Sequence, residues 1–349
     1  MKTILTLFSA LAVFFTATHH ASATNPSLFL HFPAKDGTSQ GKKIVLVGGD
    51  EEYRSEESLP MLGKLLSQRH GFDCTVLFAI DAKTGTINPN NQNNIPGLEA
   101  LDDADLMIIA TRFRQLPDEQ LAHIGKFLNA GKPVIGLRTA THAFTGSAKF
   151  ENLSWGQFGL KILGEKWVNH HGIHKVQGAL AVPEPANAKN PILNGVNHAF
   201  SVSDVYGVVN LTDNDTILLR GAVTESLDPK SEAIAGEKNQ PMMPLAWLHT
   251  YTSPNGKNKG HSFCTTTGAA ADLLNADLRR LVINAAYNLT NLEVPAEADV
   301  TLVDPYNPSF YGFIKAEGHW AKRALRPADF GLGKATEADD PEGTPKWKY

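Results

Sequence analysis

The chain has 349 residues, with 32 Lys or Arg and 36 Asp or Glu, so its formal net charge at pH 7 is −4. This acidic balance excludes nucleic acid as an expected partner, because phosphate binding requires a basic surface. The length is sufficient for a large hydrophobic core, whereas two cysteines are too few to hold a fold together by disulfides. We expect Cys74 and Cys264 to lie in the core, and whether they pair stays open.

The N-terminus has the features of an export signal. Lys2 precedes an apolar run over residues 4–18, and Ala21-Ser22-Ala23 is an A-x-A cleavage signature. The run is too short to cross a bilayer comfortably, and no later segment approaches that length. We therefore expect a signal peptide over residues 1–23 that is cleaved after Ala23, no membrane span, and a secreted or periplasmic location.

The first half of the chain alternates between short apolar strands and amphipathic helices. Residues 24–41 form a polar lead-in to this pattern. Helices are expected from about Glu56 and from Pro117. Strands are expected at residues 43–47, 74–79, 105–110 and 133–137. This alternation predicts right-handed βαβ units, and hence a doubly wound and mostly parallel sheet.

The second half is less regular. It contains an expected amphipathic helix at residues 275–289 and a tail over residues 316–349 that is rich in Pro, Gly and acidic residues, which we expect to be loosely ordered. Strand candidates lie at residues 175–182, 216–220, 244–248 and 261–267. We predict one enlarged α/β domain over residues 42–315.

Polar side chains follow three of the first four strands directly. These residues are Asp50, Glu51 and Arg54 after the first strand, Arg112 after the third, and Arg138, Thr139 and His142 after the fourth. The carboxyl ends of parallel strands meet at one edge of a sheet, where ligands bind. The guanidinium of arginine is a rigid donor fork for carboxylates, carbonyls and hydroxyls. The alternative is that these residues form surface ion pairs and helix caps.

A second cluster contains His170, His171 and His174. On a helix the first and last of these would share a face, as in a zinc protease, but Gly172 weakens a helix and no glutamate lies between them. A divalent metal site that uses two of these histidines with His142 or Asp204 stays open. The alternatives are substrate contact, proton transfer, or hydrogen bonds to neighbouring residues.

Four aromatic residues in this half are candidates for stacking on a sugar ring. They are Trp155, Trp167, Tyr206 and Trp247. The alternative is that they lie in the core.

Several motifs follow one another along the chain. They are Val47-Gly-Gly-Asp50, Ile135-Gly-Leu-Arg-Thr-Ala-Thr-His142, Trp167-Val-Asn-His-His-Gly172, Pro191-Ile-Leu-Asn-Gly195, Ser203-Asp-Val-Tyr206, Pro244-Leu-Ala-Trp247 and Phe263-Cys-Thr-Thr-Thr-Gly268. In this order they resemble the ThuA-like family, which is named for a trehalose-utilisation protein, and especially its exported branch in environmental bacteria. The resemblance covers roughly residues 42–315.

The resemblance implies a flavodoxin-like sheet related to class I glutamine amidotransferases. Those enzymes carry a nucleophilic cysteine in a G-x-C-x-G turn after a strand, whereas here Arg138 and Ala140 stand at the cysteine and second-glycine positions. Arginine is always protonated and cannot be an acyl-transfer nucleophile, so we do not expect glutaminase activity. The family's association with sugars, including 3-keto-sugars, makes a small carbohydrate the expected ligand.

We therefore predict an exported protein that acts on a sugar or keto-sugar by acid/base chemistry, in an isomerisation or elimination. The candidate catalytic residues are His142, Arg138, His170, His171 and His174. The candidate substrate-binding residues are Asp50, Glu51, Arg54, Arg112, Thr139, Trp167, Asp204 and Tyr206. No cofactor is required by this prediction, and a homo-oligomer stays open. The alternatives are a non-catalytic sugar-binding protein and a metal-dependent hydrolase.

Overall fold

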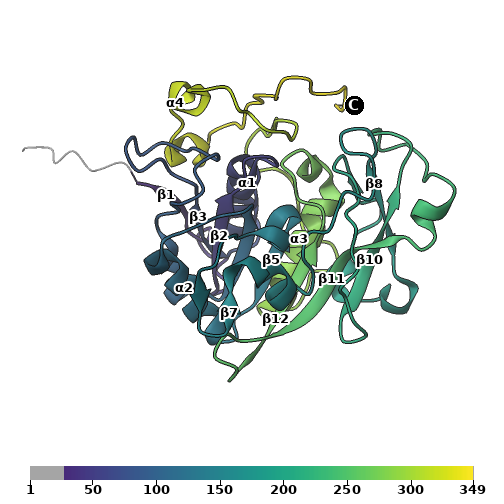
Figure 1. Ribbon diagram of the computed structural model, residues 1–349, viewed down its shortest axis with the longest axis horizontal. Coiled ribbons are helices and arrows are strands. Elements are labelled where there is room, and N and C mark those ends of the chain that lie inside the picture. Colours follow the sequence, from purple (N-terminus) through teal and green to yellow (C-terminus); the bar gives the residue numbers. More distant parts are fainter. Residues whose placement is uncertain (1–26, 349) are drawn as a thin grey trace, which may run out of the picture.

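A ten-stranded sheet forms the centre of the computed structural model, which describes residues 27–348 (Figure 1). The expected signal peptide and its cleavage site lie outside these described residues. In spatial order the strands are β1 (Phe29–Phe32), β3 (Asp73–Leu77), β2 (Lys43–Gly49), β4 (Leu106–Thr111), β5 (Val134–Leu137), β12 (Lys259–Thr265), β11 (Met243–Thr252), β10 (Thr216–Val223), β8 (Ala179–Pro183) and β9 (Phe200–Ser201). A separate hairpin pairs β6 (Lys149–Phe150) with β7 (Leu153–Ser154).

The parallel part of the sheet has flavodoxin-like topology. Strands β3, β2, β4, β5 and β12 pair in parallel, and in chain order their arrangement is 2-1-3-4-5. Strand β1 adds an antiparallel edge, and β11, β10, β8 and β9 extend the other side in antiparallel fashion. The predicted doubly wound, mostly parallel sheet is confirmed.

Helices cover both faces of the sheet because alternate strand residues are buried on opposite sides. Ile44 and Leu46 of β2 pack in one core with α1 (Ser55–Gln68) and α3 (Ala276–Leu289). Val45 and Val47 of the same strand pack in the other core with α2 (Asp118–Asn129). The sheet is therefore the middle layer of three, and its loops emerge only at its two ends.

The two cysteines lie in these cores. Cys74 in β3 and Cys264 in β12 are fully buried and carry free thiols, and β2, β4 and β5 separate their strands. The expected role in core packing is confirmed, and the two residues do not form a disulfide.

The C-terminal segment after α3 lies along the edge of the molecule next to α1 (Figure 1). Apart from α4 (His319–Arg323) it has little regular structure, yet Trp320, Phe330 and Trp347 in it are buried. Within residues 27–348, no helix is both long and apolar enough to cross a membrane.

Candidate functional site

The candidate site lies at the carboxyl ends of β2, β4 and β5, where the loops after these strands meet. Strand β2 is flanked by β3 on one side and by β4 on the other, so the chain direction of successive connections reverses there. In doubly wound sheets ligands bind at such a switch point. The structure brings the predicted polar residues after all three strands to this edge.

Asp50 organises the loop after β2. One carboxylate oxygen accepts hydrogen bonds from the backbone amides of Glu52 (2.8 Å) and Tyr53 (3.0 Å), and the other accepts from the hydroxyl of Thr139 (2.5 Å). Asp50 is buried, as is Thr139. These two predicted substrate-binding residues therefore join the loops after β2 and β5 and do not face solvent.

Asp204 joins the two histidines of the second cluster. The Nδ1 atom of His170 lies 2.8 Å from one carboxylate oxygen, and Nδ1 of His174 lies 3.1 Å from the other. The two imidazole centroids are 4.4 Å apart. Asp204 is buried, whereas both histidine side chains are partly exposed. The predicted proximity of Asp204 to these histidines is thus present in the structure.

A short backbone ladder produces this arrangement. His170 bridges Tyr206 in antiparallel fashion, the amide of His171 donates to the carbonyl of Val205, and the amide of Gly207 donates to the carbonyl of Asn169. A β-carbon at Gly207 would lie 2.2 Å from Oδ1 of Asn169, so a larger residue there would require the Asn169 side chain to move. The histidine segment is therefore an extended loop and not a helix.

Arg138 keeps Asp204 ionised. Its guanidinium donates to a carboxylate oxygen of Asp204 at 3.0 Å, to the carbonyl of the same residue at 2.6 Å and to the carbonyl of Thr266 at 2.7 Å. Although burial alone would raise it, the pKa of Asp204 is held well below its ordinary value by Arg138 and the histidines. An ionised carboxylate only accepts hydrogen bonds, so Nδ1 of each histidine donates to Asp204, and Nε2 is the ring nitrogen left for other contacts.

Arg138 itself does not reach solvent. It is 1% exposed, and its guanidinium lies between the rings of Tyr53 and Tyr206, with the carbon of the guanidinium 4.7 Å and 3.6 Å from their centroids. Its φ of +44° is unusual for a residue with a side chain and marks a sharp turn after β5. The structure therefore gives Arg138 and Tyr206 positions behind Asp204, out of reach of a ligand.

Glu52 is a buried carboxyl group that lies between His174 and Arg112. One oxygen lies 3.5 Å from Nε2 of His174, and the other lies 3.3 Å from Nε of Arg112. Burial, followed by the repulsion of Asp50, raises the pKa of Glu52 to about 7. A carboxyl group with this pKa can both give up and accept a proton at neutral pH.

His142 is a neutral imidazole. Burial and the positive charges of Arg112 and Arg138 lower the pKa of His142 to about 3. Its ring packs 4.8 Å from Phe113 and 5.6 Å from Trp167, measured between centroids. It is thus suited to accept a hydrogen bond at pH 7 and is not a cation there.

Arg112 is the arginine of this edge with an exposed part. It donates to Glu51 at 2.6 Å, and its guanidinium carbon lies 4.8 Å from the ring centroids of both Phe113 and Phe313. Its side chain is 20% exposed. The second oxygen of Glu51 accepts from the buried Arg114, so Glu51 anchors two arginines.

Other predicted residues lie elsewhere. The guanidinium of Arg54 pairs with Glu56 and Glu57 and donates to a carbonyl of the C-terminal segment, away from the histidines. Nε2 of His171 lies 2.7 Å from the carbonyl of Lys238. Trp155 and Trp247 belong to the core, so of the four aromatic candidates only Trp167 is exposed, at 37%.

The structure adds residues that the prediction omitted. They are Glu52, Phe113, Tyr311 and Phe313. Glu52 follows the same strand as Asp50, so the rule that selected Asp50 would have found it too. Nothing local in the sequence indicates that Tyr311 and Phe313 reach this edge.

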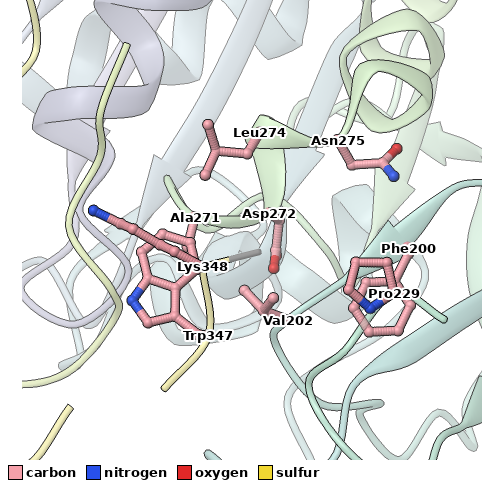
Figure 2. A pocket seen from close by; sticks show the side chains of 9 residues that line it. All are labelled: Phe200, Val202, Pro229, Ala271, Asp272, Leu274, Asn275, Trp347 and Lys348. Carbon is pink, nitrogen blue, oxygen red and sulfur yellow. The ribbon is translucent and has the colours of Figure 1, made fainter. Parts of the chain in front are cut away.

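A separate cavity of about 430 Å³ lies beside the C-terminal segment (Figure 2). Its lining is mainly apolar and includes Phe200, Val202 and Trp347. The carboxylate of Asp272 at its edge already accepts hydrogen bonds from Ser203, Gly268 and Ala269. The groups suited to proton transfer therefore lie at the histidine cluster and not in this cavity.

Comparison with known proteins identifies one family and several solved structures that resemble this chain. The profile of the ThuA family, described as trehalose utilisation, matches residues 44–288. Among solved structures, a ThuA-like protein from Bacteroides uniformis is 12% identical, with 74% of this chain and 95% of that chain covered and a TM-score of 0.43. One from Parabacteroides merdae is 13% identical, with 73% and 92% covered and a TM-score of 0.44. Comparison with curated proteins gives no match.

Proposed function

Because the chain belongs to the ThuA family of trehalose utilisation, we propose that it acts on a sugar or keto-sugar derivative by acid/base chemistry at the histidine cluster. The observation that carries this proposal is the shared contact of His170 and His174 with the buried carboxylate of Asp204. A carboxylate that orients an imidazole through Nδ1 leaves Nε2 as the nitrogen that can act as a base. Sugar binding alone does not require two histidines oriented by one carboxylate, so this pair favours a catalytic role.

The reaction that fits these groups is proton abstraction beside a carbonyl. An imidazole takes the proton from the carbon, and the bonding electron pair moves onto the carbonyl oxygen. In an isomerisation the carbonyl oxygen gains a proton, the hydroxyl on the carbon that was deprotonated gives one up to become the new carbonyl, and Glu52 or a histidine delivers a proton to the former carbonyl carbon. In an elimination the electron pair returns from the oxygen, re-forms the carbonyl and creates a C=C bond between the α and β carbons, while the oxygen on the β carbon leaves with a proton from Glu52 or a histidine. Arg112, with its partly exposed guanidinium, is placed to stabilise the negative oxygen.

In this proposal Arg138 is a positioning residue. It holds Asp204 and through it both histidines, while Asp50 and Thr139 hold the loop that carries Glu52. His142 serves as a neutral hydrogen-bond acceptor. We further propose that the mature protein, from residue 24, works after export, on the strength of the N-terminal signal sequence.

Proton NMR of residues 24–349 in heavy water tests the proposal. The samples contain glucose disaccharides or their 3-keto forms. We expect the signal of the proton next to the keto carbon to disappear faster than in a sample without protein. Line broadening of the sugar without exchange or product would instead support a non-catalytic sugar-binding protein.

A second candidate function is a metal-dependent hydrolase. One ligand atom each from His170, His174 and Asp204 lie within 4.8 Å of one another, which fits a three-ligand site with an open position. Against it, the nitrogen–oxygen distances are those of hydrogen bonds, and Arg138 already neutralises the carboxylate. Metal analysis of the purified protein, with a chelator-treated sample in the exchange experiment, decides between the two.

A further inference from the structure

Two exposed aromatic rings flank the polar centre of the site. Trp167 is 37% exposed and Phe313 is 39% exposed. Trp167 packs against His142 and His170, with centroid distances of 5.6 Å and 5.8 Å. Phe313 covers one side of Arg112. Large apolar side chains exposed beside convergent polar groups are typical of ligand contact.

Phe313 is presented by a segment that is fixed to the site on both sides. The hydroxyl and amide of Ser309 donate to Glu57 at 2.7 Å and 2.8 Å, and the amide of Gly312 donates to the carbonyl of Glu52 at 2.7 Å. On the other side, the amide nitrogen of the Asn90 side chain donates to the carbonyl of Ile314 at 3.0 Å. These hydrogen bonds fix the backbone on both sides of Phe313, so its ring is exposed in a defined position.

Tyr311, two positions before Phe313, points into the protein. Tyr311 is buried and stacks on Tyr53, with its centroid 5.1 Å away, and it packs 5.2 Å from the imidazole of His174. Its hydroxyl donates to the carbonyl of Val202. The same short segment thus supports a histidine of the centre and places an aromatic ring at its edge.

The two exposed rings belong to different parts of the site. Contacts lead from Trp167 to His142, then to Phe113 and Arg112, and only then to Phe313. A ligand unit that stacks on Trp167 lies beside the histidines. A unit that stacks on Phe313 lies on the far side of Arg112. The guanidinium of Arg112 and the ammonium of Lys315 lie over this ring, 4.8 Å and 5.3 Å from its centroid, so two charged donors are close to any sugar that contacts it.

We propose that Phe313 is a stacking platform for the second sugar unit of a disaccharide or longer ligand, while Trp167 and the histidines hold the unit that reacts. This inference rests on the proposed sugar function. The C–H face of a pyranose packs on an aromatic ring, and its hydroxyls bind charged groups at the edge. Phe313 lies outside the residues 44–288 that match the family.

Calorimetric titration of the mature protein with trehalose and with glucose tests the proposal. We expect Phe313→Ala to weaken trehalose binding about fivefold and to leave glucose binding within about twofold, since an aromatic stacking contact contributes about 1 kcal/mol. Phe313→Tyr, which keeps the ring, should retain the affinity for trehalose. Leu332→Ala removes another exposed apolar side chain of the C-terminal segment and is the matched control.

Equal effects of Phe313→Ala on both sugars, or an effect on neither, would overturn the inference and leave the sugar function in place. An unmodified protein that binds neither sugar and exchanges no proton would contradict the proposed function itself, and the inference with it. Thermal unfolding of each variant verifies that the fold is intact.

Discussion

The guanidinium of Arg138 binds two different groups of Asp204. It donates to the carboxylate of Asp204 at 3.0 Å and to the backbone carbonyl of Asp204 at 2.6 Å. One guanidinium therefore fixes both the position and the charge of the carboxylate that orients His170 and His174. The sequence suggested Arg138 as a ligand contact. In the structure it is buried, and it positions the carboxylate that His170 and His174 contact. This arrangement leads to the following predictions.

Asp204→Asn should destabilise the protein by about 3–5 kcal/mol, because removing one partner leaves the buried charge of Arg138 uncompensated. Urea unfolding measures the loss. The matched control is Asp73→Asn, which breaks the exposed ion pair with His31 and should cost less than about 1 kcal/mol. If both variants lost the same unfolding free energy, burial would not determine the strength of the ion pair between Asp204 and Arg138.

His170→Gln and His174→Gln should each slow proton exchange about a hundredfold, the contribution of one positioned base, while stability changes by less than about 1 kcal/mol. His171→Gln is the control, because its imidazole contacts the carbonyl of Lys238 and not Asp204. NMR exchange rates provide the measurement. If His171→Gln slows exchange as much as the other two, the assignment of the bases is wrong.

Acid should destabilise the protein through His142. Its folded pKa of about 3 lies below the ordinary value of 6.5, so between these values the unfolded state binds more protons. The stabilisation is complete above pH 6.5 and is lost as pH falls toward 3. We expect His142→Gln to reduce the loss of unfolding free energy between pH 7.5 and pH 4.5 by about 3 kcal/mol. Identical pH dependence in urea unfolding would contradict the shift.

Trp320→Ala should cost about 3 kcal/mol, because this side chain is 4% exposed and packs against the guanidinium of Arg54. Leu332→Ala, at a residue 45% exposed, should change stability by less than about 0.5 kcal/mol. Thermal unfolding compares the two. A negligible effect of Trp320→Ala would indicate that the C-terminal segment is as loosely ordered as its composition suggests.

Local pattern alone was sufficient to predict the parallel half of the sheet. Short β-branched runs such as residues 43–47 become buried strands in many contexts, and the helix at residues 275–289 carries its own apolar face and its Asn275 cap. Polar residues directly after such strands were correctly placed at one edge, because parallel strands end on the same side. In the antiparallel half, β8, β10 and β11 lie at the strand candidates of residues 175–182, 216–220 and 244–248, whereas the order and antiparallel pairing of these strands come from the tertiary structure.

The sequence by itself determined the fold class, the edge that carries the site, and the residue types His142, His170, His174 and Asp204 that meet there. Only the tertiary structure decided which of them face outward. Arg138, Asp50 and Thr139 turn inward because buried charges and hydroxyls require partners, and those partners come from distant loops. Phe313 reaches the site from 201 residues beyond Arg112 because backbone hydrogen bonds fix its segment there, a contact that no local pattern encodes.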